Sequence, residues 1–383
     1  MSNLTFKSRK LTWLGAVIVI FMLFSFHANA QGCVAIRSNG SSCTGLSSHY
    51  DSTGWQVNTF YRYFKSFRHY RGTAEQTERV ELGSDVRNYS NFVDINVVKH
   101  INSRWSMGLT LPFQSIKRTS LYEHDGKTRH ATSATGLGDV RLSVYAMLFK
   151  PNRWGNLQAG LGVKLPTGDY NYQDWFYKND TTYSFGAVDQ SIQPGDGGTG
   201  ISLELNGNVN LYKGLGLYGN FYYMSNPRNV NGTSTTRGGT ASATALKYRT
   251  NVMSCSDQYA VRGGVNYGFH GLFLGVGLRM EGIPAEDLIG GSDGFRRPGY
   301  TVGVEPNLAY SWNRYDIQIS VPYAIKRNRV QSTSDIQRTK DTGVFTQGDA
   351  AFADYSINLG FSVRIGSYGR QMMGMNSAGM SGH

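Results

Sequence analysis

The sequence predicts an all-β protein, a transmembrane antiparallel β-barrel of about 12 strands with short periplasmic turns and long extracellular loops. Three observations predict this fold. Only 17% of the 383 residues are charged, whereas about 25% is usual for a soluble protein. Apolar and polar residues alternate with a period of two along most of the chain. The connections between the alternating stretches are short and long by turns along the chain, so that each short connection is followed by a long one. Outer-membrane barrels show the same arrangement.

The first 30 residues are typical of a signal peptide. Basic residues between 7 and 10 precede an apolar run over 11–26, and Ala28 and Ala30 supply a small-x-small cleavage signal. The run is short for a membrane-spanning helix, which needs about 20 residues, although a retained helical anchor is the alternative. The expected organisation is a signal peptide over 1–30, a periplasmic segment over 31–53, the barrel over 54–365 and a flexible Met-rich tail over 366–383.

The three cysteines fit an exported protein. Cys33 and Cys43 lie in a segment rich in Gly and Ser, where a local disulfide can form in an oxidising compartment. Cys255 would then be unpaired, and three unpaired thiols are the alternative. No histidine lies at ligand spacing from the first two cysteines. We therefore expect no metal site and no cofactor, although the thioethers of the Met-rich tail are of a type that suits Cu(I).

The strands are predicted from the alternation. In 201–211 the odd positions from Ile201 to Leu211 carry Ile, Leu, Gly or Val, and polar residues such as Glu204 and Asn206 lie between them. In a strand these two sets point to opposite faces. Tilted strands of about nine to eleven residues cross a bilayer. The predicted strands lie near 55–66, 87–99, 105–116, 139–149, 156–166, 201–212, 215–224, 258–268, 272–281, 300–311, 315–326 and 352–365.

The connections between these strands predict the topology. Short connections alternate with long ones, and a soluble β-sandwich has no reason to sort its loops in this way. With both termini in the periplasm, every long loop falls outside the cell, and an even strand number suits a single-chain bacterial barrel. The long connections are 68–86, 117–138, 167–200, 225–257, 282–299 and 327–351.

Charged residues collect on one face of the predicted strands. The other face is nearly free of charge over its central stretches, as expected when a Lys or Arg facing lipid costs about 2–4 kcal/mol. The charged face should therefore line the lumen. Its positive members are Arg62, Arg141, Lys164, Arg262, Arg279, Lys326 and Arg364, and its negative members are Asp94, Asp139, Glu204, Glu281, Glu305, Asp316 and Asp354.

Several short motifs, in their order, resemble one family. They include Gly136-Leu137-Gly138-Asp139, Leu165-Pro166-Thr167-Gly168-Asp169-Tyr170, Glu281-Gly282-Ile283-Pro284 and Gly348-Asp349-Ala350-Ala351-Phe352-Ala353-Asp354-Tyr355. Together they resemble the outer-membrane family named for the meta-pathway of phenol degradation, over most of 54–365. The resemblance implies a Gram-negative outer-membrane barrel that moves small compounds, aromatic or apolar ones among them. It implies no catalytic residues.

No catalytic site is predicted. Gly290-Gly291-Ser292-Asp293-Gly294 matches G-x-S-x-G, but a nucleophile elbow needs a strand before it and a helix after it. The segment from Phe295 to Gly299 leads instead into another strand. We therefore expect a protein that is not an enzyme, and a barrel lipid hydrolase is only a remote third hypothesis.

The loop over 282–299 is the expected constriction. Its charged residues Asp287, Asp293, Arg296 and Arg297 can fold into the lumen as a pore loop. The alternative is an exposed loop whose charges pair with one another. The lumen itself holds seven predicted residues of each sign, whereas a charge-selective pore shows one sign in excess. These residues can line a substrate path or pair for structural reasons.

The sequence thus predicts passive passage of small compounds, inward or outward, through a porin-like channel in the outer membrane. A structural or adhesive barrel without transport is the second hypothesis. The expected partners are outer-membrane lipid and lipopolysaccharide, the barrel-assembly machinery and a small-molecule substrate of unknown identity. Nucleic acid is not an expected partner, because the basic excess is scattered along an exported chain.

Overall fold

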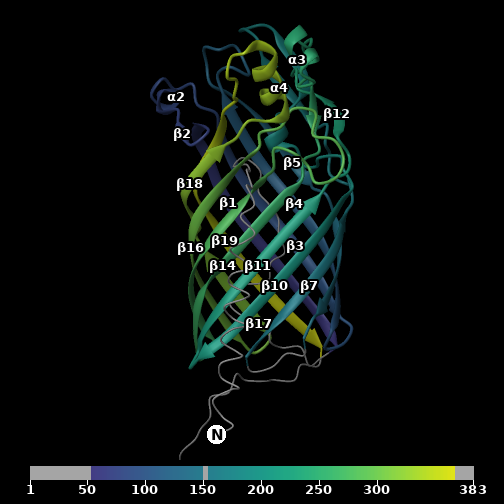
Figure 1. Ribbon diagram of the computed structural model, residues 1–383, viewed down its shortest axis with the longest axis vertical. Helices are drawn as coiled ribbons and strands as arrows, with labels where there is room; N and C mark the ends of the chain where they lie inside the picture. Colours follow the sequence, from purple (N-terminus) through teal and green to yellow (C-terminus); the bar gives the residue numbers. More distant parts are fainter. Residues whose placement is uncertain (1–52, 150–153, 367–383) are drawn as a thin grey trace, which may run out of the picture.

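The alternating segments form one continuous antiparallel sheet that closes on itself between its first and last strands (Figure 1). The computed structural model describes residues 53–149 and 154–366. The predicted signal peptide, the Cys33–Cys43 disulfide and nearly all of the Met-rich tail lie outside these residues. The register at closure runs without a break from Gly54↔Gly366 to Phe64↔Ser356.

Twelve strands make the wall, which confirms the predicted fold class. Two of the twelve are interrupted, so that β5 and β6 form one wall strand and β17 and β18 form another. The strands are β1 (Gly54–Arg71), β3 (Arg87–His100), β4 (Trp105–Ser120), β5 (His130–Leu137) with β6 (Arg141–Met147), β7 (Gly155–Lys164), β10 (Gly200–Tyr212), β11 (Leu215–Ser225), β14 (Gln258–Phe269), β15 (Leu272–Ile283), β16 (Gly299–Trp312), β17 (Tyr315–Ser320) with β18 (Tyr323–Arg329), and β19 (Ala350–Gly366).

The short connections are tight turns at one end of the barrel. Lys213–Gly214 joins β10 to β11, and His270–Gly271 joins β14 to β15. All four residues have positive φ, between 42° and 88°, as the two-residue hairpin turn with the favoured twist requires. Glycine at the second position of each turn adopts this conformation without steric cost.

The long connections gather at the other end and form a crown (Figure 1). The crown carries secondary structure that the alternation did not predict, because these elements are short and flanked by Gly, Ser and Asn. Its elements are β2 (Ala74–Glu75), α2 (Thr77–Glu81), β8 (Gln173–Tyr177), β9 (Tyr183–Ala187), the 3-10 turn η2 (Gln190–Ile192), β12 (Val230–Ser234), α3 (Ala243–Lys247), β13 (Val252–Ser254) and α4 (Thr333–Thr342).

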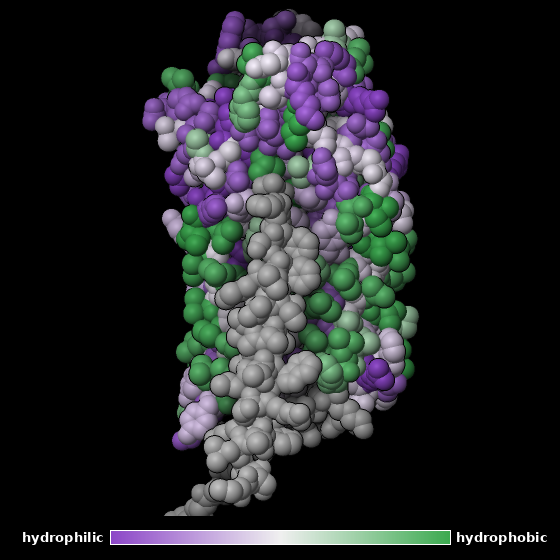
Figure 2. All heavy atoms as spheres, viewed as in Figure 1, coloured by the Kyte–Doolittle hydropathy of each residue, from purple (hydrophilic) through white to green (hydrophobic). Residues whose placement is uncertain are grey.

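The outer surface of the wall is apolar. On β10, Leu203 and Val209 are 41% and 49% exposed. Glu204 and Asn208, which have the opposite parity in the strand, are buried toward the lumen. Figure 2 shows apolar side chains over the middle of the barrel and polar ones over the crown. This distribution is the reverse of that in a soluble protein and suits a wall surrounded by lipid. Among the described residues, no helix has the length and apolar character needed to cross a membrane.

The predicted strand 315–326 is broken at Pro322, and its pairing with the neighbouring strand β19 changes there. β17 pairs with β19 over six residues, whereas β18 pairs with β19 at one position, Tyr323↔Tyr355. Proline has no N–H to donate to a ladder, so strands seldom continue through it. Past the break, the Arg327 side chain reaches β19, where Nε donates to Ala353 O at 3.0 Å and Nη2 contacts Asp354 Oδ1 at 2.7 Å.

Candidate functional site

Five of the predicted lumen residues meet in one cluster halfway along the barrel, here called the central cluster. Arg279 contacts Glu281 at 2.6 Å and Glu305 at 3.5 Å. Arg262 lies 4.0 Å from Glu305, and Arg62 lies 3.7 Å from Glu281. Glu305 is 1% exposed, so its charge is offset mainly by these arginines, because buried charges need partners.

The central cluster reaches across the interior of the barrel. Arg62 lies on β1 and Glu281 on β15, and the wall strands β16, β17 and β19 separate them. Their contact therefore bridges the lumen instead of joining neighbouring strands. The lumen at this level is narrowed by paired side chains.

The remaining predicted residues on β3, β6 and β10 also point inward. Arg141 and Glu204 are 5% and 3% exposed, and Arg141 Nη1 lies 3.4 Å from the Tyr222 hydroxyl. Asp94 is half-buried on the same face of the wall. Near the periplasmic turn, Arg364 pairs with Asp316.

Lys326 differs from its predicted placement. β16 pairs Val302 with Lys326 and the next residue, Gly303, with Ala324, so Ile325 is an extra residue in β18. Such a bulge reverses the alternation beyond it. Lys326 is therefore exposed, and Arg327 is buried in its place. Asp354 pairs with Arg327 at 2.7 Å and with Arg68 at 3.0 Å.

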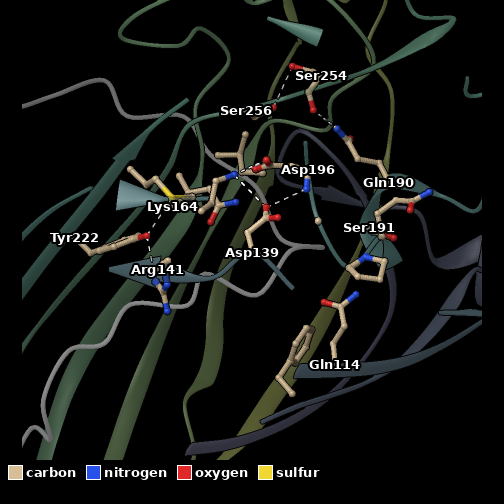
Figure 3. Close-up of a pocket in the computed structure, with 17 residues that line it drawn as sticks. Gln114, Asp139, Arg141, Lys164, Gln190, Ser191, Asp196, Tyr222, Ser254 and Ser256 are labelled. Atoms are coloured by element: carbon tan, nitrogen blue, oxygen red, sulfur yellow. Dashed lines mark hydrogen bonds and ion pairs between the residues drawn. The ribbon is translucent and has the colours of Figure 1, made fainter. Parts of the chain in front are cut away.

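A cavity of about 120 Å³ lies in the lumen between Arg141 and the crown (Figure 3). Its charged residues are paired within the protein. Lys164 Nζ lies 3.3 Å from Asp139 Oδ2 and also contacts Asp196. Asp139 in addition accepts the backbone N–H groups of Gly168 at 3.0 Å and Asp196 at 3.2 Å.

Apart from Arg141, whose Nη1 contacts the Tyr222 hydroxyl, the rest of the cavity lining is neutral. Amide and hydroxyl side chains, among them Gln258 and Ser256, share it with the apolar side chains of Phe92, Met224 and Ile283. A neutral molecule that enters this cavity thus meets both hydrogen-bonding groups and apolar surface. A charged molecule would have to compete for partners that are already engaged, at a cost in desolvation.

Residues 188–196, here called the inward segment, cover this cavity from the crown side. Val188 and Ile192 are fully buried against Phe64, Phe92 and Ile116, which face into the barrel. Gln114 Nε2 on β4 donates to Ile192 O at 2.9 Å. Gly195 packs so closely on Gly168 that a Cβ at Gly195 would collide with the Gly168 carbonyl. The segment is therefore fitted to the lumen.

The inward segment is held by a buried ionic contact between loops. Both Asp189 carboxylate oxygens accept from Arg297, at 2.8 and 2.6 Å, and Arg118 lies 3.4 Å from Oδ2. Burial by itself would raise the pKa of Asp189, but the charges of Arg118 and Arg297 hold it well below its usual range. Asp189 therefore stays ionised, and the contact between Asp189 and Arg297, here called the latch, remains charged.

The loop expected to form the constriction has a different role. Asp287 pairs with Arg296 at 2.9 and 2.6 Å, with both side chains buried, and Asp293 pairs with Arg249 on another loop at 2.8 Å. Of the four predicted residues, Arg297 forms an ion pair with the inward segment. The loop over 282–299 thus holds the segment that narrows the lumen, and that segment comes from the loop over 167–200.

Sequence reasoning missed Asp189, Arg118 and Glu123 as members of this site. Arg118 binds Glu123 at 2.9 Å and supports the latch from the wall. Its inward direction follows from the alternation on β4, which continues past residue 116, where the predicted strand ended. No pattern marks Asp189, because its partner Arg297 is 108 positions away.

No family model matches the chain, and no curated protein matches it. Among solved structures, the COG4313 outer membrane channel from Pseudomonas putida F1 superposes with a TM-score of 0.55 at 14% identity. The match covers 86% of this chain and 100% of that one. The chain has the fold of an outer-membrane β-barrel. At this identity the likeness establishes the fold alone, and it confirms at that level the resemblance that the motifs predicted.

Two further structures are more distant. The barrel matches the P. putida toluene transporter TodX with a TM-score of 0.39 at 11% identity, covering 86% of this chain and 94% of that one. It matches a Pseudomonas aeruginosa FadL homologue with a TM-score of 0.43 at 8% identity, covering 88% and 99%. Likeness at this level is too weak to support an inference.

Proposed function

We propose that this barrel is a passive outer-membrane channel for small, uncharged molecules, and that the inward segment is its gate. The observation that carries the proposal is the cavity beneath that segment. Its volume of about 120 Å³ is close to that of an engineered cavity, about 150 Å³, that binds benzene. Molecules with a single ring, with or without a polar group, therefore suit the site in size.

The charge pairing supports an uncharged solute. Lys164 is engaged by both Asp139 and Asp196 at the cavity, and the central cluster below it combines three arginines with two glutamates in mutual contact. A passing ion would have to displace one of these buried partners, which costs several kcal/mol. A neutral ring would pass without breaking a pair of charges.

The latch makes the gate testable. Asp189→Asn would weaken the contact with Arg297 and Arg118 by about 3 kcal/mol, by analogy with other buried ion pairs. A change of this size would raise the ratio of open to closed channels roughly a hundredfold. The matched control is Asp293→Asn, because Asp293 also pairs with an arginine in the crown but the pair is largely exposed and does not touch the inward segment.

The experiment compares the wild-type protein with both variants in planar bilayers and in proteoliposomes. We expect Asp189→Asn to have higher single-channel activity than the wild type. We also expect the substitution to increase the entry of benzyl alcohol more than the entry of benzoate or benzylammonium. Asp293→Asn should behave as the wild type does. Identical conductance and permeation in all three proteins would contradict the gate. Absence of any solute entry in all three would instead favour a structural or adhesive barrel.

Catalysis is not part of this proposal. Ser292 of the G-x-S-x-G match lies in the crown loop between β15 and β16, where its hydroxyl accepts the Asp287 N–H at 2.8 Å. No helix follows it before β16 begins at Gly299, so the geometry of a nucleophile elbow is lacking at this serine. Lipid hydrolysis by the purified barrel, lost on Ser292→Ala, would overturn this view.

A further inference from the structure

The β8–β9 hairpin of the crown carries three exposed aromatic side chains that the channel does not use. Trp175, Tyr183 and Phe185 are 54%, 48% and 50% exposed. The rings of Trp175 and Phe185 lie together, with centroids 4.9 Å apart. Tyr183 lies on the same face of the hairpin, two residues before Phe185 on β9. These three residues, here called the aromatic platform, are exposed on an element that lies outside the barrel wall.

The hairpin beneath the platform is firmly held. Phe176 points to the opposite side of β8 and is completely buried. Ser184 Oγ on β9 donates to Arg237 O at 2.9 Å, and Gly186 packs against Gly238 so closely that a Cβ would collide with its backbone. The exposed rings are therefore held in place before any partner arrives, which lowers the entropy cost of binding.

The platform lies just above the apolar belt. Asp174, beside Trp175, accepts the Ser133 N–H at 2.8 Å, and Ser133 pairs with Lys117 on β4. On the outward face of β4, the apolar residues end at Phe113, four positions below Lys117. Four residues of a tilted strand span about 10 Å. The rings thus lie at the height of the lipid headgroups and not of the acyl chains.

We propose that the aromatic platform binds the sugar headgroup of the outer-leaflet glycolipid, lipopolysaccharide. Sugar rings present C–H groups that stack on aromatic faces, and aromatic residues are favoured at membrane interfaces. Lys117, which pairs with Ser133 beside Asp174, is exposed and can contact a phosphate of the headgroup, whereas Lys178 lies over the buried Phe176 ring on the other side of β8. Of the nearby acids, Asp174 is engaged with Ser133, and Asp180 is exposed at the tip of the hairpin.

The test measures binding of lipopolysaccharide to the full-length purified protein by the rise in its melting midpoint. The test variant is Trp175→Ala with Phe185→Ala. The matched control is Val344→Ala with Phe345→Ala, since these side chains are 67% and 66% exposed after α4 and lie apart from the hairpin. Loss of two stacking rings should weaken binding roughly fivefold to tenfold. Phosphatidylglycerol, which is anionic but has no sugar ring, serves as the comparison lipid.

We expect lipopolysaccharide to raise the melting midpoint of the wild type and of the control, and to raise that of the test variant much less. Phosphatidylglycerol should affect all three equally. The proposal would be overturned if lipopolysaccharide raised the melting midpoint of the test variant as much as that of the wild type. It would also be overturned if the test variant lost its response to phosphatidylglycerol to the same extent, because that result would indicate a general lipid contact. If the double variant fails to fold, Phe185→Ser alone is tested by the same criteria. Channel activity need not change in any of these variants, so this proposal and the gate can fail separately.

Discussion

Arg62 on β1 and Glu281 on β15 meet across the lumen, with Nη1 and Oε2 3.7 Å apart, although three wall strands lie between them. The same carboxylate binds Arg279 at 2.6 Å, and Arg279 in turn contacts Glu305. Charges from wall strands that are not neighbours thus form one network. A solute that passes the middle of the barrel must pass beside these paired side chains.

The first prediction concerns this network. Glu305→Gln removes the carboxylate that Arg262 and Arg279 share, so the net positive charge of the cluster increases by one. We expect the residual ion conductance to shift toward anions, and the free energy of unfolding to fall by about 2–3 kcal/mol, less than for loss of a whole buried partner. Reversal potentials and urea unfolding of one preparation measure both effects.

Asp316→Asn is the matched control for Glu305→Gln. It breaks the pair with Arg364 at the periplasmic end, so it should lower stability and leave ion selectivity nearly unchanged. If Glu305→Gln changed neither conductance nor unfolding, Glu305 would have no part in the network. A loss of stability without a change of selectivity would mark the pair as purely structural.

The second prediction concerns the lipid face of β10. Leu203 and Leu211 both face outward and are 41% and 46% exposed, but Leu203 lies nearer the middle of the membrane and Leu211 near the periplasmic turn. Leu203→Arg should reduce the free energy of unfolding by about 2–4 kcal/mol, and Leu211→Arg by about 0–1 kcal/mol. Refolding titrations into lipid vesicles compare the two. Equal costs would show that this face is not buried in lipid.

The third prediction concerns the bulge in β18. Arg327 is buried and binds Ala353 O and Asp354, whereas its neighbour Lys326 is exposed. Arg327→Gln should lower the free energy of unfolding by about 3 kcal/mol, while Lys326→Gln should change it by less than about 0.5 kcal/mol. Comparable losses in thermal melts of the two variants would mean that the alternation continues without a bulge.

The fourth prediction concerns pH and the crown. Asp349 accepts from His69 Nδ1 at 2.9 Å and pairs with Arg79 at 2.8 Å. Burial opposes ionisation, but the contacts with His69 and Arg79 hold the pKa of Asp349 at about 2. Because this pKa is depressed in the folded protein, ionised Asp349 contributes stability above the unfolded pKa of about 3.9, and the contribution is lost as pH falls toward 2.

We therefore expect the crown to become sensitive to an acid-active protease such as pepsin as pH falls from about 4 to about 2. Asp349→Asn should lose this tether at all pH values and show little further change in that interval. The control is Asp341→Asn, because Asp341 pairs with Lys247 on the exposed surface of the crown. A wild-type crown with the same protease resistance at both pH values would contradict the prediction.

Much of the barrel follows from the sequence because membrane burial acts on every strand in the same local way. Each side chain faces either lipid or the lumen, so the alternation from Ile201 to Leu211 already separates the two faces of β10. The alternation also predicts the inward direction of Arg118, once β4 is followed to its end. Pairs between wall residues such as Arg279 and Glu305 follow as well, since neighbouring strands bring their inward charges within reach.

The tertiary structure decided what local periodicity does not encode. One extra residue in β18 reversed the faces of Lys326 and Arg327, and a bulge has no period of its own. The position of the inward segment depended on Asp189 and Arg297, which are 108 positions apart and lie in loops without alternation. A buried charge is stable beside any opposite charge that the fold brings near it. The sequence alone therefore determined that the buried charges must pair. Only the packing of the loops decided which acid pairs with which base.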